Sequence, residues 1–471
     1  MSSRRGLVLA VAVVVLLAGG LLVDHQVGRA GPTAPLAAAR PVGAPVASPS
    51  GALSSTWYCP GGQSAPDQAA STSVALANPT GHEATGRILV LPAQGDPLES
   101  PVTVPPRGQT VVDLATVFGG PVVAGASVDL DQGGVVVQQT VKVPEGTIVA
   151  PCSSSASTTW YTAAGSTGRD ADLLLSVLNP FPDDAIVDLS FATDQGGAAP
   201  AELQGIVVPN RHLVVVDVGD KVRRRDAVSA SVNARRGRVV VGKVQRRGSS
   251  STSTLAAPVT SPSWFFASGG KLDGLTDGLQ LFNPSAQDAS VTVELNLDKG
   301  AVEPLSVTVP AGGRGEVVVS ASTGIGKGVG YAATVQSADG VGIVAERTFL
   351  ASSPLSRPGS DIDELGMIGG AGRWVSAAGD LKGSDSLAIV NLGIEPATIT
   401  FLVLDGKNGP VPGVEPMTVP SGARGTVALD GHLTQRNQAV LVESDQPVLV
   451  DRGGFDPAGP VSSFTPAVPL P

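Results

Sequence analysis

Residues 263–285 read SWFFASGGKLDGLTDGLQLFNPS: a tryptophan-led apolar phrase, a glycine-rich turn, and an apolar run that ends at Asn283-Pro284. Similar arrangements occur three more times in the 471 residues, at intervals of roughly 100 residues. The chain has four tryptophans, and each one opens a copy: Trp57, Trp160, Trp264 and Trp374. Internal repetition at a nearly fixed period indicates that the chain is built from four equivalent modules.

Further landmarks follow each tryptophan in the same order. An apolar run ends at an asparagine, and a Val-Pro pair then precedes a polar turn and a valine-rich run. A closing apolar run completes each copy: GVVVQQTVKV, RVVVGKVQRR, VGIVAERTFL and PVLVDRGGF. The asparagines are Asn78, Asn179, Asn283 and Asn391, and the prolines are Pro105, Pro209, Pro310 and Pro420. Landmarks that stay in register four times indicate one shared fold.

Apolar residues within the copies alternate with polar ones. Residues 289–298, ASVTVELNLD, and 397–405, ATITFLVLD, have a period of two, the signature of a strand with one face in a core. Asn-Pro, Asp-Gly and Gly-Gly pairs between such runs favour turns. The sequence therefore predicts an all-β protein of four tandem antiparallel, β-sandwich-like (Ig-like) modules. Periodicity leaves open whether the modules form a string or a closed ring.

The first 30 residues are expected to direct export. Arg4 and Arg5 precede an uncharged run over residues 6–23, which as a helix would span about 27 Å, close to the roughly 30 Å of a membrane core. We predict a signal anchor that leaves a single-pass protein in the cytoplasmic membrane, with its bulk outside. Cleavage near Gly28-Arg29-Ala30, which would give a secreted protein, is the alternative.

Composition and landmarks together predict the domain boundaries. Residues 1–30 form the N-terminal signal segment, and residues 31–55, rich in Pro, Ala, Gly and Ser, form a disordered spacer. The four β modules are expected over residues 56–152, 153–248, 249–350 and 351–460, with a C-terminal tail over residues 461–471.

The four tryptophans have two interpretations. A residue of that size at the first strand of every copy fits a role in filling one end of each core. A ligand-stacking platform is the alternative, but aromatic residues make up only 4% of the chain, which is few for an aromatic binding site. We therefore predict that Trp57, Trp160, Trp264 and Trp374 are core residues of the repeat.

The landmarks resemble a repeat found in many exported bacterial proteins. Its features are an opening Trp-aromatic phrase, an Asn-Pro turn, a VPAG-x-R strand entry and a closing VAER strand. The third copy carries all of them, through Trp264, Asn283-Pro284, Pro310, Arg314 and Glu346-Arg347. Over residues 55–460 the chain resembles a family of actinobacterial membrane-anchored proteins that is classified only as a domain of unknown function. The resemblance implies an exported, membrane-anchored protein and no particular activity.

An acid and a base stand side by side in the closing run of the third copy, at Glu346-Arg347. The fourth copy has Asp451-Arg452, whereas the first has Gln138-Gln139 and the second has Lys243 nearby. Because the pair is missing from two copies and adjacent strand residues point to opposite faces, a catalytic role is disfavoured. We predict a structural ion pair at a module boundary.

Two cysteines, Cys59 and Cys152, lie near the start and the end of the first module. An even number of cysteines in an exported protein predicts a disulfide. A redox-active pair is disfavoured, because such a pair needs a short motif or a neighbouring basic activator.

No stretch carries a convincing set of catalytic or ligating residues. The four histidines lack a second His or Cys at metal-ligand spacing, and DIDELG at 361–366 places Leu365 where a calcium loop needs an oxygen ligand. The SxxK pattern at 268–271 and the glycine-rich stretch at 324–330 lack the helix that each motif requires. The sequence therefore predicts no catalytic residue, no metal and no cofactor.

Positive charge is concentrated in one stretch. The whole chain has a net charge of −10, which disfavours binding to nucleic acid, but residues 211–247 hold eleven Lys and Arg against three Asp. One interpretation is a solvated edge that discourages aggregation between strands. The other is an anion-binding face for an envelope polymer, lipid headgroups or an acidic protein. The candidate residues of that face are Arg223, Arg224, Arg225, Arg235, Arg236 and Arg238.

These patterns favour a non-enzymatic cell-envelope protein with a structural or interaction role, held at the cytoplasmic membrane by its N-terminal helix. An anionic envelope polymer or another envelope protein is its expected partner. The alternative is an accessory protein that binds or processes an envelope polymer (glycan) in a cleft between modules.

Overall fold

The computed structural model describes residues 45–62, 71–143, 146–248, 250–271, 273–351, 361–377, 385–407, 409–435, 437–454 and 463–471. The expected N-terminal helix and the spacer up to residue 44 lie outside these ranges. Among the described residues, no helix is long and apolar enough to cross a membrane. The strands pair in antiparallel sheets throughout, so the all-β prediction is confirmed.

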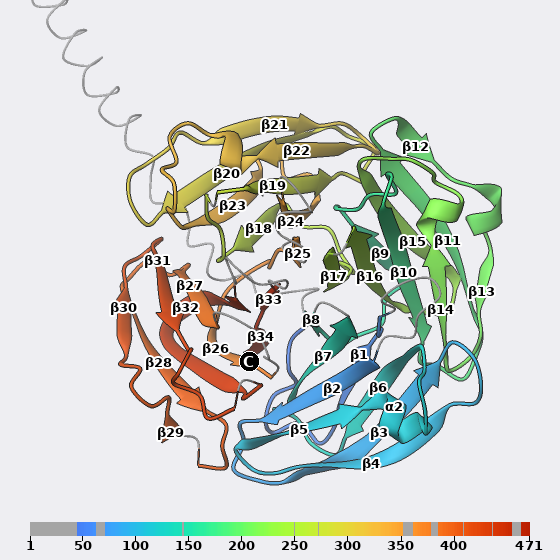
Figure 1. Ribbon diagram of the computed structural model, residues 1–471, viewed down its shortest axis with the longest axis horizontal. Helices are drawn as coiled ribbons and strands as arrows, with labels where there is room; N and C mark the ends of the chain where they lie inside the picture. The colour runs from blue at the N-terminus through green and yellow to red at the C-terminus, as the bar shows by residue number, and fades with distance from the viewer. Residues whose placement is uncertain are drawn as a thin grey trace, which may run out of the picture.

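Four groups of strands surround a common centre (Figure 1). We call them the first unit (β1–β8), second unit (β9–β17), third unit (β18–β25) and fourth unit (β26–β34). Each of the first three units contains two sheets. One contains the strand that carries the tryptophan and is called the tryptophan sheet. The other, called the axial sheet, ends in the strand nearest the centre of the ring.

The tryptophan sheets have the orders β1-β6-β3-β4, β9-β15-β11-β12 and β18-β23-β20-β21. In the fourth unit, one long strand, β32, runs through both sheets and joins them into a single nine-stranded sheet. The strand bounds are β1 Ser55–Cys59, β3 Ala84–Pro92, β4 Leu98–Val104, β6 Ala124–Leu130, β9 Thr159–Thr162, β11 Ala185–Thr193, β12 Gly196–Ala198, β13 Ile206–Val208, β15 Val228–Arg236, β18 Ser263–Phe266, β20 Ala289–Leu297, β21 Leu305–Val309, β23 Tyr331–Ser337, β26 Ala371–Ser376, β28 Ala397–Val403, β29 Gly409–Pro410, β30 Met417–Val419, β32 Val440–Gly454 and β34 Val468–Leu470.

The axial sheets have the orders β5-β2-β7-β8, β14-β10-β16-β17 and β22-β19-β24-β25, and β31, β27, β32 and β33 pair in the corresponding order in the fourth unit. Their bounds are β2 Ser71–Asn78, β5 Gly108–Asp113, β7 Val136–Val143, β8 Gly146–Pro151, β10 Ala171–Asn179, β14 His212–Asp217, β16 Val240–Arg247, β17 Ser250–Leu255, β19 Leu275–Phe282, β22 Arg314–Val318, β24 Val344–Ala351, β25 Ile362–Leu365, β27 Ser386–Asn391, β31 Arg424–Ala428 and β33 Ser463–Pro466. Short helical turns are α2 Leu114–Phe118, η2 Ala201–Leu203, η3 Val218–Asp220 and η4 Val319–Ala321.

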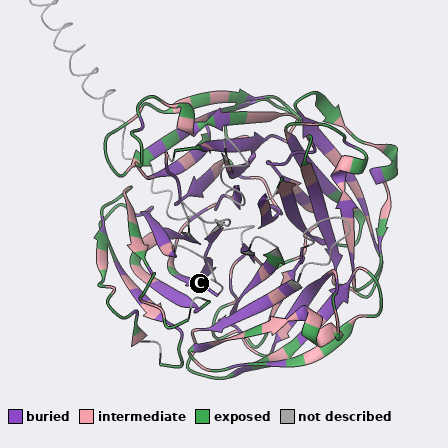
Figure 2. Cartoon of the chain, viewed as in Figure 1, coloured by how far each residue is buried: buried purple, intermediate pink, exposed green. Residues whose placement is uncertain are grey.

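The core of each unit lies between its strands. Strand β20 alternates buried and more exposed residues along most of its length, as its period-two sequence predicts. Buried residues dominate the strands toward the inside of the ring, and exposed ones gather at its outer edge (Figure 2). The hydrophobic clusters also continue across unit boundaries, because Phe265 and Ala267 of the third unit pack in the core of the fourth.

The tryptophans lie in these cores and are at most 1% exposed. In three units the indole N–H donates a hydrogen bond to a backbone carbonyl. Trp160 bonds to Val239 (2.8 Å) and Trp264 to Ile343 (2.8 Å), each just before the closing strand, and Trp374 bonds to Val448 (2.9 Å) within β32. Each indole thus links the first strand of its unit to the strand that closes it.

The repeated asparagines explain why the Asn and Val-Pro landmarks recur together. All four asparagines are fully buried. In the third unit, Asn283 Nδ2 donates to the carbonyls of Gln287 (2.6 Å) and Val309 (3.1 Å), while its Oδ1 accepts from the N–H of Ser285 (3.0 Å). Asn391 makes the equivalent bonds although Leu392 replaces the proline. The side chain therefore fixes its own turn and joins it to the residue before the Val-Pro proline.

Several predicted boundaries need correction. Strands β17 and β25 complete the axial sheets of the second and third units, so the boundaries predicted at 248 and 350 come too early. The segment predicted as a tail contains β33 and β34. The predicted spacer ends before residue 55, because Ala47 is 2% exposed and its N–H donates to Pro469 O (3.1 Å). These segments are polar or proline-rich and are ordered by contacts with other units, which composition does not reveal.

The ring is closed. The four innermost strands, β8, β17, β25 and β33, contact one another in turn around the centre (Figure 1). The fourth unit meets the first through Gln109 Nε2, which donates to Asn437 O (2.9 Å), and through Thr465 Oγ1, which donates to Val149 O (2.8 Å). Leu470 also packs in the core of the first unit. Of the two arrangements that the sequence left open, the structure therefore has the ring.

Candidate functional site

Polar and charged side chains are buried on the strands that carry the closing runs, β7, β16, β24 and β32. At matching places each strand has two residues, called here the connector pair. All the side chains of these pairs are at most 3% exposed. The pairs are Gln138-Gln139, Gly242-Lys243, Glu346-Arg347 and Asp451-Arg452. Charged groups this far from water occur almost only where they are paired.

The first residue of the connector pair binds the neighbouring unit. Glu346 accepts hydrogen bonds from the N–H groups of Ala163 (3.0 Å) and Ala164 (3.2 Å) in the second unit. Asp451 accepts in the same way from Ala267 (2.9 Å) and Ser268 (3.0 Å) in the third unit. In each case the donors directly follow the tryptophan strand, so one carboxylate satisfies two buried N–H groups across a unit boundary.

The ring-closing boundary uses an amide in place of a carboxylate. Gln138 Oε1 accepts a hydrogen bond from Ala377 N–H in the fourth unit (2.7 Å), and its Nε2 donates to Pro466 O (3.3 Å). The connection between the fourth and first units is therefore neutral.

The boundary between the first and second units departs from the pattern. Pro60 stands where the other units have the first N–H donor, and proline has no N–H to offer. Its partner position is Gly242, where an added Cβ would lie 2.8 Å from Pro60 Cγ and 3.1 Å from its Cβ. Pro60 lacks an N–H donor, and Gly242 opposite it lacks a side chain that would need one.

Lys243 is the centre of a buried ion cluster between the second and third units. Its Nζ donates to Ala164 O (2.8 Å), forms a close ion pair with Glu346, and lies 3.3 Å from Asp363 Oδ2. Thr252 Oγ1 also donates to Asp363 (3.0 Å), and Arg247 lies 3.6 Å from it. Two positive groups therefore face two carboxylates at this boundary.

The neighbouring charges determine the pKa values of Lys243 and Asp363. Burial by itself lowers the pKa of Lys243, but Asp363 and Glu346 outweigh that effect and raise it. Burial raises the pKa of Asp363, whereas Lys243 and Arg247 pull it down further, so its pKa ends below the ordinary value. Both groups are thus held in their charged forms.

Strands β24 and β25 divide these charges between two faces. Arg347 lies directly opposite Glu364 in the antiparallel register, while Glu346 and Asp363 occupy the alternate positions. Glu346 and Asp363 face the second unit. Arg347 lies 3.3 Å from Asp277 Oδ1 and is stacked over Phe266, with 5.0 Å from its guanidinium carbon to the ring centroid.

Asp277 completes the other face together with Tyr331, whose hydroxyl donates a hydrogen bond to it. Burial raises the pKa of both groups, and Arg347 offsets part of the effect at Asp277. The arrangement holds one arginine between aromatic rings and a carboxyl group, away from water.

Glu346 and Arg347 therefore do not form the ion pair with each other that the sequence predicted, but each forms an ion pair with another residue. Glu346 is bound to Lys243 and Arg347 to Asp277, so the two neighbours contact different partners on opposite faces. Asp451-Arg452 behaves in the same way, since Arg452 forms a two-bond ion pair with Asp385 (2.9 and 2.6 Å).

Sequence reasoning missed Asp277, Asp363, Glu364 and the burial of Lys243. The signal was a charge in the middle of an otherwise apolar closing run, at the same place in three copies. In the sequence, residues 361–366 resemble only an incomplete calcium loop. Their role as partners depends on β25 lying at the ring centre, which the repeat does not predict.

The six arginines of the candidate anion-binding face do not form one surface. Arg223, Arg224 and Arg225 precede β15, while Arg235, Arg236 and Arg238 lie at its other end, and a nine-residue strand is about 30 Å long. Arg235 is paired with Asp188, and Arg238 stacks over Phe181 at 4.9 Å. Lys243, counted in the same basic stretch, is buried. The structure therefore shows two small clusters.

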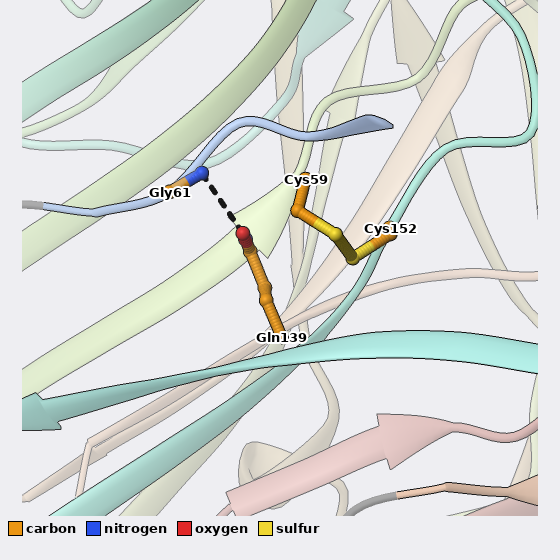
Figure 3. Close-up of a disulfide and its surroundings, with 4 residues drawn as sticks. All are labelled: Cys59, Gly61, Gln139 and Cys152. Atoms are coloured by element: carbon orange, nitrogen blue, oxygen red, sulfur yellow. Dashed lines mark hydrogen bonds between the residues drawn. A yellow bond between two sulfur atoms is a disulfide. The ribbon is translucent and has the colours of Figure 1, made fainter. Parts of the chain in front are cut away.

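The predicted disulfide between Cys59 and Cys152 is present, and both residues are fully buried. It joins the end of β1 to the chain just after β8 (Figure 3). Beside it, Gly61 N–H donates to Gln139 Oε1 (2.8 Å), so the second residue of this connector pair holds the loop that follows β1.

The described part of the ring contains a cavity and a cleft. A small cavity of about 30 Å³ lies at the centre, lined by Pro45, Thr254, Glu364, Phe464 and other residues of the innermost strands. A larger cleft of about 470 Å³ lies where the first and fourth units meet, lined by Ser48, Thr80, His82, Gln132, Arg373 and neighbouring residues. Across the described ranges, no three His, Cys, Asp or Glu side chains come together as metal ligands.

Comparison with known proteins gives a family match and weak structural similarities. A family of unknown function, DUF5719, matches residues 118–324, in agreement with the inferred resemblance to a domain of unknown function. No curated protein matches the chain.

Solved structures that align with this chain include the following three. They are a biofilm-associated protein BSP domain (8% identity, 88% of this chain, 96% of that chain, TM-score 0.15), a tetra-tandem repeat from the extending region of a large adhesion protein (14%, 83%, 92%, 0.10) and the Streptomyces avermitilis α-L-rhamnosidase (11%, 82%, 55%, 0.10). TM-scores this low support no conclusion about this chain.

Proposed function

We propose that the chain is a non-enzymatic structural or interaction protein of an actinobacterial cell envelope, and that it presents four Ig-like β modules outside the cytoplasmic membrane. The observation that carries this proposal is what the repeated residues do. The tryptophans pack in the cores, the asparagines fix turns within the units, and the polar connector residues bond within the chain, several of them across unit boundaries. Repetition thus serves assembly of a rigid body, and a rigid body with an exposed rim is suited to contacts with other envelope components.

One feature supports the proposed location, and another supports the proposed way in which the ring is attached. The buried disulfide is the kind of bond that persists in oxidising, extracytoplasmic compartments. In addition, Pro45 lines the central cavity, so the chain enters the ring near its centre. Residues 1–30, proposed as a membrane anchor, would hold the ring by its middle and leave the rim accessible. Cleavage of that segment would release the same ring as a secreted protein.

The proposed location is tested with reporter fusions at the C-terminus of the full chain. Alkaline phosphatase folds only outside the cytoplasm, so its fusion should be active, and a reporter that works only in the cytoplasm should be inactive. The reverse pattern would contradict an envelope location.

The interaction role is tested by photo-cross-linking in intact cells. A photoreactive residue at Ile394 (66% exposed) or Val207 (52% exposed) should capture an envelope component, because both apolar side chains are exposed on the surface. The matched control is Thr252, which is buried between units and should link only within the chain. If the two surface positions give no adducts while the control links internally, the chain has no contact partner at these places.

The arginine clusters support an anionic partner, and each one is tested by itself. Arg223, Arg224 and Arg225 are replaced by Ser in one variant, and Arg235 and Arg236 in another. If a cluster binds anionic polymer or lipid, its variant should bind anionic vesicles less well than wild type, and binding should weaken as salt rises. Equal binding by wild type and variants would leave edge protection as the role of these charges.

A second candidate function is favoured by the cleft between the first and fourth units. Its volume falls in the range of ligand sites, and its lining offers hydroxyl, amide and imidazole groups suited to the hydroxyls of a glycan. Arg373 in its wall is already paired with Glu443 (3.0 Å), so an uncharged ligand fits better than a strongly anionic one. Soluble wall glycan fragments should bind wild type and lose affinity for Gln132→Ala. Absence of binding by wild type would exclude this alternative.

A further inference from the structure

The boundary between the third and fourth units has an excess of acid. The face of β24 and β25 that carries Arg347 brings together one cation and three acids: Arg347, Asp277, Glu364 and Asp451. Each of these side chains is at most 2% exposed. On the opposite face, Lys243 and Arg247 balance Glu346 and Asp363. Only the first of these two faces is left with uncompensated negative charge.

Two of the acids lie against each other. Asp451 uses Oδ2 to accept the N–H groups of Ala267 and Ser268, which leaves Oδ1. Neither Asp451 Oδ1 nor Glu364 Oε2 meets an N–H or O–H donor among the described residues. Glu364 and Asp451 each shift the pKa of the other, so the two carboxyl groups are close neighbours. Two neighbouring carboxyl groups can form a hydrogen bond with each other only if one of them carries a proton.

We propose that Glu364 and Asp451 share one proton, and that this proton latches the third unit to the fourth. With it, the pair carries a single negative charge beside Arg347 and keeps Asp451 in place over the two N–H groups that it binds. Without it, two carboxylates would stand side by side with one arginine, which Asp277 also contacts.

The surroundings of the pair point in the same direction. Burial raises the pKa of both carboxyl groups, and the charge of Asp451 raises that of Glu364 further. Arg347 from β24 lowers both, while Asp277 from β19 adds negative charge at Glu364. Asp451 also accepts the N–H groups after β18, and Glu364 lines the central cavity together with the hydroxyl-bearing Ser253 and Thr254.

The sign of the pH effect follows. The unfolded chain releases the proton above the ordinary glutamate pKa of 4.5, whereas the folded ring keeps it. The contribution to stability is therefore complete below that value and is lost as pH rises toward the pKa of the folded pair. Alkaline conditions should loosen the boundary between the third and fourth units. The ring-closing contact through the neutral Gln138 does not titrate.

Infrared spectroscopy of the full-length chain in mild detergent tests the shared proton directly. At about pH 7, roughly three units above ordinary carboxyl pKa values, side-chain carboxyl groups are ionised and only a retained proton gives a protonated-carboxyl band. Wild type should show this band, and Glu364→Gln and Asp451→Asn should lose it. Asp363→Asn is the matched control, because it removes a buried acid whose pKa is lowered by Lys243 and Arg247 and which is therefore ionised, and it should keep the band.

Unfolding as a function of pH tests the latch. In Glu364→Gln the amide donates to Asp451 permanently, so folding should survive and its pH dependence should flatten. Between about pH 6 and 9 the unfolding equilibrium constant of wild type should rise by up to about tenfold per pH unit relative to this variant. Asp363→Asn, on the balanced face, should be less stable but keep the wild-type slope. A wild type without the band, a band that persists in both pair variants, or equal slopes in wild type and Glu364→Gln would each overturn the proposal.

Discussion

At the residue scale, Lys243 shows how completely one side chain can depend on a neighbouring unit. It belongs to the second unit, yet both of its carboxylate partners, Glu346 and Asp363, come from the third. A lysine with no exposed surface keeps its charge only because those carboxylates are fixed within reach. In the sequence it is one of eleven basic residues within 211–247, and no neighbouring residue indicates that it is buried.

Lys243→Met is expected to destabilise the ring strongly. The substitution keeps the apolar stem but leaves the buried Glu346 without a cation and Asp363 with Arg247 alone, and breaking a buried pair in this way typically costs about 3–5 kcal/mol. Urea unfolding of wild type and variant measures the difference. Lys221→Met is the control, because Lys221 forms an exposed pair with Glu202 (3.6 Å) and should cost no more than about 1 kcal/mol. Equal losses would mean that burial of the pair has no energetic effect.

At the element scale, the connectors explain why the loop after each tryptophan strand and the closing strand of the next unit vary together. Where the loop offers N–H groups, the strand offers a carboxylate or an amide. Where the loop has Pro60, the strand has Gly242, and an added Cβ there would meet the proline ring. The two elements of a boundary are therefore fitted to each other rather than to the repeat.

Gly242→Ala should thus destabilise the boundary between the first and second units, by roughly 1–3 kcal/mol of overpacking. Pro60→Gly removes the obstructing ring, so the alanine should cost less in that background, and the double variant should be more stable than the two separate losses predict. A double-mutant cycle from denaturant unfolding measures this coupling. Gly197→Ala is the control: its Cβ would touch only Phe191 O at 3.9 Å, and it should be nearly neutral. Additive losses would show that Pro60 and Gly242 act independently.

The elements also show how far the sequence could predict the fold. Strands such as β20 follow from their alternation, and the turns follow from Asn and Val-Pro, because both signals are local. The innermost strands gave no such signal. Strand β17 reads SSTSTL, which lacks the apolar alternation that marks a strand, and its neighbours β8 and β25 belong to other units. For the same reason, Asp363 and Glu364 could not be placed in a site: their partners come from other units.

At the scale of the whole molecule, ring closure brings the first and last units together. A chain starting at residue 45 should scatter X-rays as one compact body with a radius of gyration of about 22 Å, whereas a string of four such units would give roughly 40 Å. Removing residues 467–471 deletes β34, including Val468 and Leu470, which pack in the core of the first unit. The radius should then increase. A truncated chain as compact as the intact one would show that β34 is not needed for closure.

The disulfide is the one covalent link between distant parts of the described ring. Replacing Cys59 and Cys152 together by Ala frees a loop of 93 residues, which in the chain-entropy model costs about 4–5 kcal/mol. The midpoint of thermal unfolding should fall, and a reducing agent should lower that of wild type to a similar value without affecting the variant. A reducing agent that shifts both proteins equally would mean that the bond is not the source of the difference.

Because the connectors are chemically unlike, each unit boundary accepts only its own partner. If the fourth unit docked against the first unit's loop, Asp451 would face Pro60 and would lose one of its two N–H donors. If the third unit docked against the fourth unit's loop, Glu346 would face Ala377 and would have no lysine to pair with. Four similar modules in one chain could otherwise dock against one another in the wrong order. Because the four boundaries differ in chemistry, they specify the order of the units and disfavour a ring in which the units are rearranged.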